Sequence, residues 1–485
     1  MNEIIGRERE KKQLKRLIDS KDPELLALYG RRRIGKTYMI QNYFCDKGVY
    51  FELSGMSRGK TQDQLNKFPK AMQKTFLLEN PISTPKNWQK AFDLLIEEIE
   101  KISEEKKVIL FLDELPWLAT KRSDLLMVLE DFWNNYLSRR KNAILILCGS
   151  AASWMIKKII NNKGGFYGRL TEQIHLQAFS LYETEIYLNL KNIHFDRKQL
   201  VELYLVTGGV AKYLNHVRRG MSVAQTIQEL CFTSSGFLAK EFPNLFASLF
   251  ENHRSHMAIV QALAKHRQGL TSTELANKAG LSTGGTYSNI LQELEASGFI
   301  QMVPFYKQKK KLGLYRLIDE YSYFYLTWVK EAIFSQGGAI SRQYWLSMHR
   351  DPRFITWAGY AFENICLKHI DRIVEFLKIS VVARNAYYWA YRTDNKKLSG
   401  AQIDLIIDRT DNCMNLCEIK FSNSRYIMTK EYAEKLNERR NIFASVTKSK
   451  KSLFNTLITP YGAMENSSYF SSVDNQMDLD GLFSF

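Results

Sequence analysis

The sequence has 485 residues, of which 45% are hydrophobic and 13% aromatic. At about 150 residues per domain, this length predicts roughly three domains with packed cores and excludes a wholly disordered chain. With 68 Lys and Arg against 51 Asp and Glu, the formal net charge is +17, which favours a polyanionic partner. The 9 Pro and 26 Gly exclude a collagen-like or low-complexity architecture.

No segment of the sequence is typical of membrane insertion or export. The longest apolar stretch, residues 143–156, is shorter than the roughly 20 residues that a transmembrane helix needs. The first ten residues include acidic side chains and lack the apolar core of a signal peptide. The six cysteines are not grouped at metal-binding spacings, so we interpret them as reduced thiols. These features predict a cytoplasmic protein without a membrane partner.

The first 175 residues alternate short apolar runs with helix-compatible segments. The runs cover residues 25–30, 49–55, 107–114, 142–150 and 173–180. Buried strands separated by helices predict a parallel sheet covered on both faces, an αβα core over residues 1–175. Helical spacing in the next segment predicts that residues 176–250 form a helical lid.

Directly after the first apolar run, residues 30–37 read GRRRIGKT and match the phosphate-binding pattern GxxxxGK[ST]. In this pattern the glycines let backbone N–H groups surround the phosphates at a helix N-terminus. Lys36 is expected to reach the β- and γ-phosphate oxygens, and the Thr37 hydroxyl is expected to be a ligand of Mg²⁺. We therefore predict that ATP and Mg²⁺ bind to the residues of this loop: Gly30, Arg31, Arg32, Arg33, Ile34, Gly35, Lys36 and Thr37.

Two further strand ends supply polar side chains. The third apolar run is followed by Asp113 and Glu114, which places two carboxylates at the end of a buried strand. Asp113 is predicted to hold Mg²⁺, and Glu114 is predicted to polarise the attacking water. The fourth run ends at Ser150, whose hydroxyl is suited either to sensing the γ-phosphate or to capping the next helix.

These motifs, together with IIGRERE at residues 4–10, CGSAAS at 148–153 and YGRL at 167–170, resemble the AAA+ family often called archaeal ATPases. The family is related to the signal-transduction NTPases, and the resemblance implies an ATP-hydrolysing AAA+ core with residues 6–8 on the adenine side. It also implies that Arg169 touches the γ-phosphate, from the same chain or from a neighbouring subunit of a homo-oligomer; a structural ion pair is the alternative. Residues 208–212 are similar to the family's GGxP lid segment, in which Lys212 would be a sensor, but Ala211 replaces the proline.

Residues 251–330 have the order of segments that is typical of a winged helix. Thr271 and Glu274 form a capping box at the start of one short helix, and a second helix follows the turn at Gly280. The core face of the second helix is expected to carry Ile290, Leu291 and Leu294. Its polar face is expected to meet a DNA major groove with Thr283, Thr286, Tyr287, Asn289 and Gln292. The turn that would form the wing carries Lys307, Lys309, Lys310 and Lys311, which would meet phosphates. A rigid spacer or a protein-binding module is the alternative.

After a helical linker predicted at residues 331–350, residues 351–485 are expected to form a small α/β domain. Two strand-like runs carry Asp404 and the sequence Glu418-Ile419-Lys420, in which Glu418 and Lys420 share one face of a strand. With Glu363 on the preceding helix, the three carboxylates form a candidate site for Mg²⁺ or Mn²⁺, beside which Lys420 orients water or stabilises developing charge.

This C-terminal pattern resembles the PD-(D/E)xK nuclease superfamily over residues 350–460. The resemblance implies a restriction-endonuclease-like fold and metal-dependent DNA cleavage. An inactive relative that binds DNA or protein, or a Glu–Lys pair on a solvated surface, is the alternative.

Together these features predict an α/β multidomain protein, a cytoplasmic Mg²⁺-dependent ATPase that couples nucleotide state to DNA binding and carries a candidate nuclease site. Two alternatives stay open. One is a nucleotide-gated switch that signals through protein contacts and has a catalytically inactive C-terminal domain. The other is a basic ATPase that acts on no nucleic acid.

Overall fold

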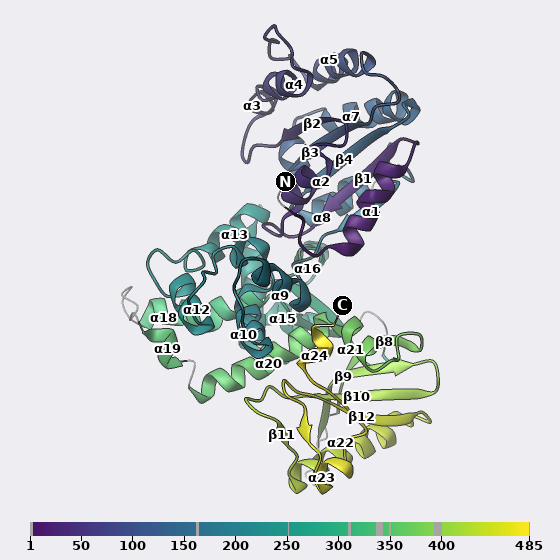
Figure 1. Ribbon diagram of the computed structural model, residues 1–485. Helices are drawn as coiled ribbons and strands as arrows, with labels where there is room; N and C mark the ends of the chain where they lie inside the picture. The colour runs from purple at the N-terminus through teal and green to yellow at the C-terminus, as the bar shows by residue number, and fades with distance from the viewer. Residues whose placement is uncertain are drawn as a thin grey trace. The chain divides into compact units, whose positions relative to one another are not determined.

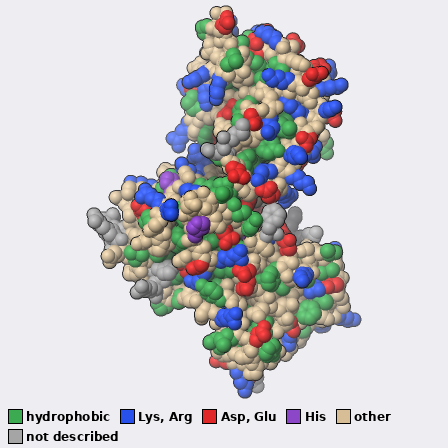
Figure 2. Space-filling model, in the orientation of Figure 1, with side chains coloured by type: hydrophobic (Ala, Val, Ile, Leu, Met, Phe, Trp, Pro, Cys, Tyr) green, Lys and Arg blue, Asp and Glu red, His purple; other side chains and the backbone are tan. Residues whose placement is uncertain are grey.

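The computed structural model of the protein (Figure 1) describes residues 3–161, 164–250, 252–308, 312–335, 343–348, 351–391 and 400–484. The chain divides into two compact units, residues 1–178 (unit 1) and residues 179–485 (unit 2). Within the described residues, every helix is too short or too polar to span a lipid bilayer. On the face shown in Figure 2, Lys and Arg side chains are scattered among Asp and Glu over both units.

Unit 1 is built on a five-stranded sheet with the order β2-β3-β4-β1-β5, in which all neighbouring strands are parallel. The strands are β1 (Glu24–Tyr29), β2 (Val49–Ser54), β3 (Val108–Asp113), β4 (Ala143–Gly149) and β5 (Glu172–His175). Each of the five apolar runs therefore forms a strand, as the sequence predicts.

Helices cover both faces of this sheet, so the strands need apolar side chains on both sides. In β1, Leu26 and Leu28 pack with Ile40 of α2, whereas Leu25 on the opposite face packs with Leu95 of α5. The helices of unit 1 are α1 (Glu8–Asp19), α2 (Lys36–Phe44), α3 (Thr61–Leu65), α4 (Phe68–Phe76), α5 (Trp88–Glu100), α6 (Leu115–Leu118), α7 (Leu125–Asn135), η1 (Leu137–Arg139), α8 (Ala152–Met155) and η2 (Ile156–Ile160).

Unit 2 begins with helices and continues into a winged-helix arrangement. The first group is α9 (Leu181–Leu190), α10 (Arg197–Thr207), α11 (Ala211–Leu214), α12 (Val223–Cys231) and α13 (Glu241–Leu249). The second is α14 (His253–Lys265), α15 (Ser272–Ala279), α16 (Gly285–Ala296), β6 (Ile300–Pro304) and β7 (Gly313–Leu317), with β6 and β7 antiparallel. The predicted capping box of α15 is present: the Glu274 backbone N–H donates to the Thr271 hydroxyl, and the Glu274 carboxylate accepts from the Thr271 N–H.

The C-terminal part of unit 2 contains a mixed sheet with the order β14-β12-β10-β9-β8. Strands β8, β9 and β10 are antiparallel neighbours, and β10, β12 and β14 are parallel neighbours. The helices are α17 (Glu320–Phe324), η3 (Tyr325–Val329), α18 (Lys330–Ser335), α19 (Tyr344–Met348), α20 (Pro352–Lys368), α21 (Ile370–Phe376), α22 (Lys430–Thr447), α23 (Ser467–Phe470) and α24 (Leu479–Leu482). The strands are β8 (Ala383–Tyr391), β9 (Ala401–Arg409), β10 (Cys413–Ile419), β11 (Tyr426–Ile427), β12 (Ser452–Ile458), β13 (Ala463–Met464) and β14 (Asn475–Met477).

The wing of the winged helix is joined to the edge of this mixed sheet. Phe305, directly after β6, forms an isolated parallel bridge with Tyr388 of β8, and the Tyr306 N–H donates to the Tyr388 carbonyl at 3.0 Å. A buried ion pair adds a second link, because Arg316 of β7 contacts Glu363 of α20 at 2.9 Å. The winged helix and the C-terminal sheet are thus parts of one packed unit.

Candidate functional site

The predicted nucleotide-binding residues of unit 1 come together at one edge of the sheet. Gly30, Glu114 and Ser150 directly follow β1, β3 and β4, which are adjacent in the order β3-β4-β1. Since these strands are parallel, their carboxyl ends meet at the same edge, where open α/β sheets bind ligands.

Three residues of the phosphate-binding loop have positive φ angles, which residues other than glycine rarely adopt. Gly30 has φ 147°, and a Cβ at this position would lie 2.2 Å from the Leu176 carbonyl oxygen. Arg33 and Gly35 also have positive φ, at 71° and 97°. Helix α2 begins immediately afterwards, at Lys36, so its N-terminus faces the loop.

Lys36 lies inside the loop. Its side chain is 6% exposed, and Nζ donates to the carbonyls of Gly30 at 3.0 Å and Arg31 at 2.8 Å. The neighbouring Thr37 points in another direction, because its hydroxyl donates to Asp113 Oδ2 at 2.9 Å. The loop and the end of β3 are therefore in direct contact.

Asp113 and Glu114 place two carboxylates beside this contact. Burial raises the pKa of Asp113, and the neighbouring Glu114 raises it further, while hydrogen bonds from Cys148 and Thr37 act in the opposite direction. Two adjacent acids in a low-dielectric site favour a cation, so Thr37 and Asp113 fit the Mg²⁺ role that the sequence predicts. Glu114 accepts two hydrogen bonds from Ser150 on a single oxygen, Oε2: from the backbone N–H at 3.2 Å and from the hydroxyl at 2.7 Å.

Two further residues contact the loop, and the sequence around them does not predict these contacts. Arg7, which the resemblance places only on the adenine side, is 5% exposed and donates to the carbonyl of Ile34 at 3.4 Å. Trp117 lies under the Arg32 guanidinium, 5.5 Å from the ring centroid. Both contacts depend on tertiary packing.

The two remaining candidates for nucleotide sensing are exposed. Arg169 of unit 1 lies in a turn, where its N–H donates to the Phe166 carbonyl at 3.1 Å. Lys212 lies in α11 of unit 2, with its side chain in solvent. Each side chain is therefore exposed within its own unit.

The second helix of the winged-helix region, α16, presents most of its predicted polar face. Its core face is as expected, with Ile290, Leu291 and Leu294 buried. The side chains that are exposed, as predicted, are Thr283, Thr286, Asn289 and Gln292.

One expectation for the winged helix is wrong, and a second stays a prediction. Tyr287 is not available to a DNA groove, because its ring is buried and its hydroxyl donates to the Ser272 carbonyl at 2.8 Å. Lys307 is exposed, as a phosphate contact requires, and its ammonium donates to the Thr447 carbonyl at the end of α22 at 2.7 Å. The other wing lysines, Lys309, Lys310 and Lys311, lie outside the described residues.

The C-terminal candidates gather on the mixed sheet. Glu418 lies in β10 and Lys420 directly follows this strand, and their side chains form an ion pair at 2.7 Å. Burial raises the pKa of Glu363 to about 7, and Asp404 adds to this shift. Burial also raises the pKa of Asp404, and Glu418 contributes to that shift. The acids are therefore close enough to influence one another.

Basic groups of the protein pair with two of these acids, Glu363 and Glu418, whereas Asp404 accepts a hydrogen bond from the Gln402 amide. Glu418 contacts Arg439 at 2.9 Å and also accepts from the Tyr432 hydroxyl, while Glu363 contacts Arg316. Across the described part of the chain, no three His, Cys, Asp or Glu side chains converge closely enough to hold a metal ion. The cluster as it stands is an ion-pair network.

Comparisons with known proteins agree with two of these regions. Residues 4–217 match a family model described as an ATPase domain predominantly from Archaea, and residues 257–304 match the IclR helix-turn-helix domain. The chain therefore carries an archaeal-type ATPase domain and, C-terminal to it, an IclR-type helix-turn-helix domain. The expected ATPase core and winged helix are confirmed at this level.

An uncharacterised protein of Methanocaldococcus jannaschii is 24% identical over 425 residues, 87% of this chain and 88% of the relative. Among solved structures, a Walker-type ATPase of Pyrococcus abyssi has a TM-score of 0.48 and 17% identity, over 67% of this chain and 96% of that one. The ORC2 protein of Aeropyrum pernix, in ADPNP–ADP complexes, has a TM-score of 0.43 and 16% identity, over 70% of this chain and 97% of that one.

Proposed function

We propose that the protein is a Mg²⁺-dependent ATPase that couples its nucleotide state to DNA binding by the winged helix. The observation that carries the proposal is the contact between Thr37 and Asp113 at 2.9 Å, beside Lys36 and Glu114. Phosphoryl transfer to water needs a loop that holds the phosphates, a hydroxyl that binds the metal and a carboxylate that activates water. The loop with Lys36, the Thr37 hydroxyl and the Glu114 carboxylate would supply these three groups.

Each residue of this edge has a chemical task. The phosphates are bound by the backbone N–H groups of residues 30–37 and by the Lys36 ammonium. When ATP binds, Lys36 gives up its hydrogen bonds to the Gly30 and Arg31 carbonyls and donates to phosphate oxygens instead. Thr37 and Asp113 would hold Mg²⁺, which supplies positive charge to the β- and γ-phosphates when bound. Glu114 orients the attacking water and accepts its proton, and Ser150 orients Glu114. Arg169, exposed in its turn, would stabilise the γ-phosphate from the same chain or from a neighbouring subunit.

For DNA, the support is the exposed polar face of α16 in a domain of the helix-turn-helix type. Short polar side chains on that face suit hydrogen bonds to base edges in a major groove. Exposed Lys307 would add a phosphate contact by exchanging its hydrogen bond with the Thr447 carbonyl for a phosphate oxygen. We expect sequence recognition of a duplex to depend on α16.

The test combines hydrolysis with binding. Phosphate release from ATP is measured for wild type and Glu114→Gln, and duplex affinity is measured with ATP, ADP or no nucleotide. We expect Glu114→Gln to bind ATP and to hydrolyse it far more slowly, and duplex affinity to differ between the ATP and ADP states. Equal duplex affinity in all nucleotide states would leave an ATPase without coupling.

Metal-dependent cleavage of DNA by the C-terminal sheet is a second candidate function. The specific observation in its favour is the mutual influence of Glu363, Asp404 and Glu418 on one face that also carries Lys420. Against it stand the ion pairs of Glu418 with Arg439 and of Glu363 with Arg316, which occupy the carboxylates that Mg²⁺ or Mn²⁺ would need.

The test incubates wild type, Lys420→Ala and the exposed control Lys430→Ala with several DNA forms in Mg²⁺ or Mn²⁺. It decides whether the C-terminal site is an active nuclease or is inactive. Cleavage lost only in Lys420→Ala would establish the nuclease. Identical products, or none, in all three proteins would favour the alternative, a nucleotide-gated switch that acts through protein contacts with an inactive C-terminal domain.

A further inference from the structure

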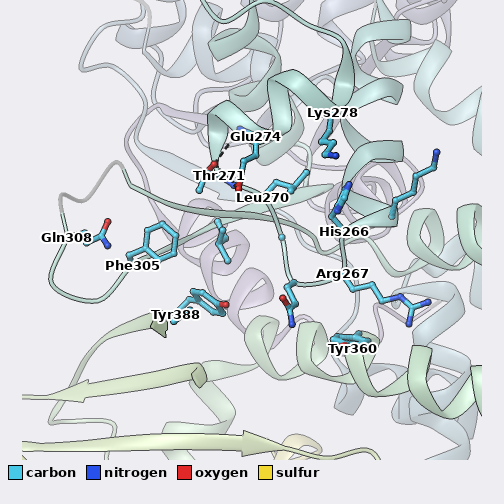
Figure 3. A pocket seen from close by; sticks show the side chains of 15 residues that line it. His266, Arg267, Leu270, Thr271, Glu274, Lys278, Phe305, Gln308, Tyr360 and Tyr388 are labelled. Carbon is cyan, nitrogen blue, oxygen red and sulfur yellow. Dashed lines mark hydrogen bonds between the residues drawn. The ribbon is translucent and has the colours of Figure 1, made fainter. Parts of the chain in front are cut away.

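A cleft between the winged helix and the C-terminal part of unit 2 is separate from both sites described above. Its volume is about 800 Å³, within the roughly 300–1,000 Å³ of pockets that hold organic ligands. Figure 3 shows one wall formed by the end of α14, the start of α15 and the wing. The opposite wall contains Tyr360 of α20 and Tyr388 of β8.

The lining of the cleft carries an excess of positive charge. Lys265, Arg267 and Lys278 line it and are exposed. Glu274 is the single carboxylate among the described lining residues, and it accepts hydrogen bonds from the Thr271 N–H at 2.9 Å and hydroxyl at 2.8 Å. A concave surface with three accessible cations favours phosphate groups.

Two partly exposed aromatic rings, Phe305 and Tyr360, line the same cleft, whereas Tyr388 is buried beside Phe305. The rings of Phe305 and Tyr388 lie 6.0 Å apart at 53°, and the Arg267 guanidinium lies over Tyr360, 5.5 Å from its centroid. The Phe305 ring is held in place because its backbone pairs with β8. Aromatic rings and guanidinium planes at a basic groove are the surfaces on which nucleobases stack.

We propose that this cleft binds single-stranded nucleic acid, with bases against Phe305 and Tyr360 and phosphates toward the three cations. A duplex keeps its bases stacked on one another and offers no free base face to the aromatic rings, whereas a single strand does. The inference rests on the proposed nucleic-acid binding of this chain but assigns it to residues outside α16.

The position of the cleft also relates it to the C-terminal acids. Tyr360 and Glu363 are three residues apart on α20, so they lie on neighbouring positions of one helix face. Glu363 in turn belongs to the cluster with Asp404. A strand bound against Tyr360 therefore lies about one helical turn from those carboxylates.

The experiment measures binding of the full chain to a fluorescent oligothymidylate by anisotropy. The variant Arg267→Ala/Lys278→Ala is compared with Arg219→Ala/Lys240→Ala, which removes two exposed cations of unit 2 outside the cleft. We expect the cleft variant to bind at least about tenfold more weakly, with a salt slope smaller by about 1.4 for two lost phosphate contacts. Equal affinity of both variants would overturn the proposal.

A second measurement tests stacking without depending on a variant's stability. An abasic strand of equal length keeps the phosphates but removes the bases, so wild type should bind it about tenfold more weakly than oligothymidylate. Tyr360→Leu should reduce this difference. Equal binding of abasic strand and oligothymidylate by wild type, or displacement of the strand by an equal concentration of mononucleotide, would contradict a single-strand site. An oligoribonucleotide of the same length distinguishes RNA from DNA as the source of the strand.

Duplex binding by α16 and single-strand binding by the cleft can be tested independently of each other. Asn289→Ala/Gln292→Ala, on the exposed face of α16, should weaken duplex binding and leave oligothymidylate binding unchanged. If duplex binding is absent while strand binding depends on Arg267 and Lys278, the α16 proposal fails and the cleft stands. If duplex binding is present while the cleft variant binds strands like wild type, the cleft proposal fails alone.

Discussion

Ser150 donates both its backbone N–H and its hydroxyl to one carboxylate oxygen of Glu114, at 3.2 Å and 2.7 Å. We therefore expect the other oxygen, Oε1, to accept the proton of the attacking water. The orientation of the proposed base is thus set by the end of the neighbouring strand β4, since Ser150 directly follows that strand.

Glu114→Gln should keep ATP affinity and lower kcat by roughly 10²–10⁴-fold, because the amide keeps the size of the side chain but cannot accept the proton. Single-turnover hydrolysis and equilibrium ATP binding separate the two effects. Glu105→Gln, an exposed acid of the same unit, is the matched control and should behave like wild type. A Glu114→Gln turnover equal to that of the control would remove Glu114 from the mechanism.

Ser150→Ala should lower kcat roughly tenfold, because a hydrogen bond to a charged group contributes about 1.5–3 kcal/mol and the backbone N–H remains. The ATP dissociation constant should change little. Combining Ser150→Ala with Glu114→Gln provides the check, since a residue that acts through Glu114 adds no further loss once Glu114 is replaced. Additive losses would show that Ser150 contacts the nucleotide independently.

Thr37→Val keeps the shape of the side chain but removes the hydroxyl that contacts Asp113. We expect half-maximal hydrolysis to require at least about tenfold more Mg²⁺, whereas Thr37→Ser should stay close to wild type. A Mg²⁺ titration of the hydrolysis rate measures this, and a chelator should abolish turnover in all three proteins. An unchanged Mg²⁺ requirement in Thr37→Val would mean that the hydroxyl is not a metal ligand.

Gly30→Ala should abolish ATP binding and destabilise unit 1, because the new methyl would lie 2.2 Å from the Leu176 carbonyl oxygen at φ 147°. Gly168→Ala is the control: its φ is 67°, but no atom lies within 4 Å of the added Cβ, so it should cost only about 1 kcal/mol. Thermal unfolding and nucleotide titration of both variants measure the difference. Similar losses in both would show that the loop relaxes around the methyl.

His369 should make unit 2 less stable in acid. Burial lowers the pKa of this ring from 6.5 to about 4, and Nε2 faces the backbone N–H of Leu181 at 3.4 Å. The unfolded chain therefore binds a proton at His369 more readily than the folded chain. The stabilisation of the folded state by the neutral His369 ring is complete above pH 6.5 and declines as the pH falls toward 4. By linkage it is on the order of 3 kcal/mol.

Hydrogen exchange of α9 and α20 at pH 7.5 and pH 5 measures this dependence. His369→Gln does not titrate, so its protection should change less between the two pH values. The exposed His194→Gln should retain the dependence of wild type. A dependence that is the same in all three proteins would assign the acid sensitivity to other groups.

The sequence predicts unit 1 well because its signals are local. Strands buried on both faces are continuous apolar runs, and Gly30, Asp113 and Ser150 are fixed by where those runs end. The Glu418–Lys420 pair at the end of β10 is likewise expected from the spacing of two residues in an extended chain. The local sequence does not show which residue pairs with each polar group. Examples are Arg439, which pairs with Glu418, and Arg7, which donates to the carbonyl of Ile34.

The error at Tyr287 in the winged helix has the same cause. Tyr287 combines an apolar ring with a polar tip, so helical spacing alone cannot decide between a groove-facing and a buried position. The Tyr287 ring takes the buried position, where its hydroxyl donates to the Ser272 carbonyl. The contact of Lys307 with the Thr447 carbonyl could not be predicted either, because the two residues are 140 positions apart in the sequence.

The bridge between Phe305 and Tyr388 and the buried pair Arg316–Glu363 cross from the winged helix to the C-terminal sheet. Replacing Glu363 by Leu would leave the buried Arg316 without its carboxylate, which typically costs 3–5 kcal/mol. Recombination that exchanged only the winged helix would leave Glu363 without Arg316. Both halves of unit 2 are therefore expected to evolve together, with paired changes at these contacts.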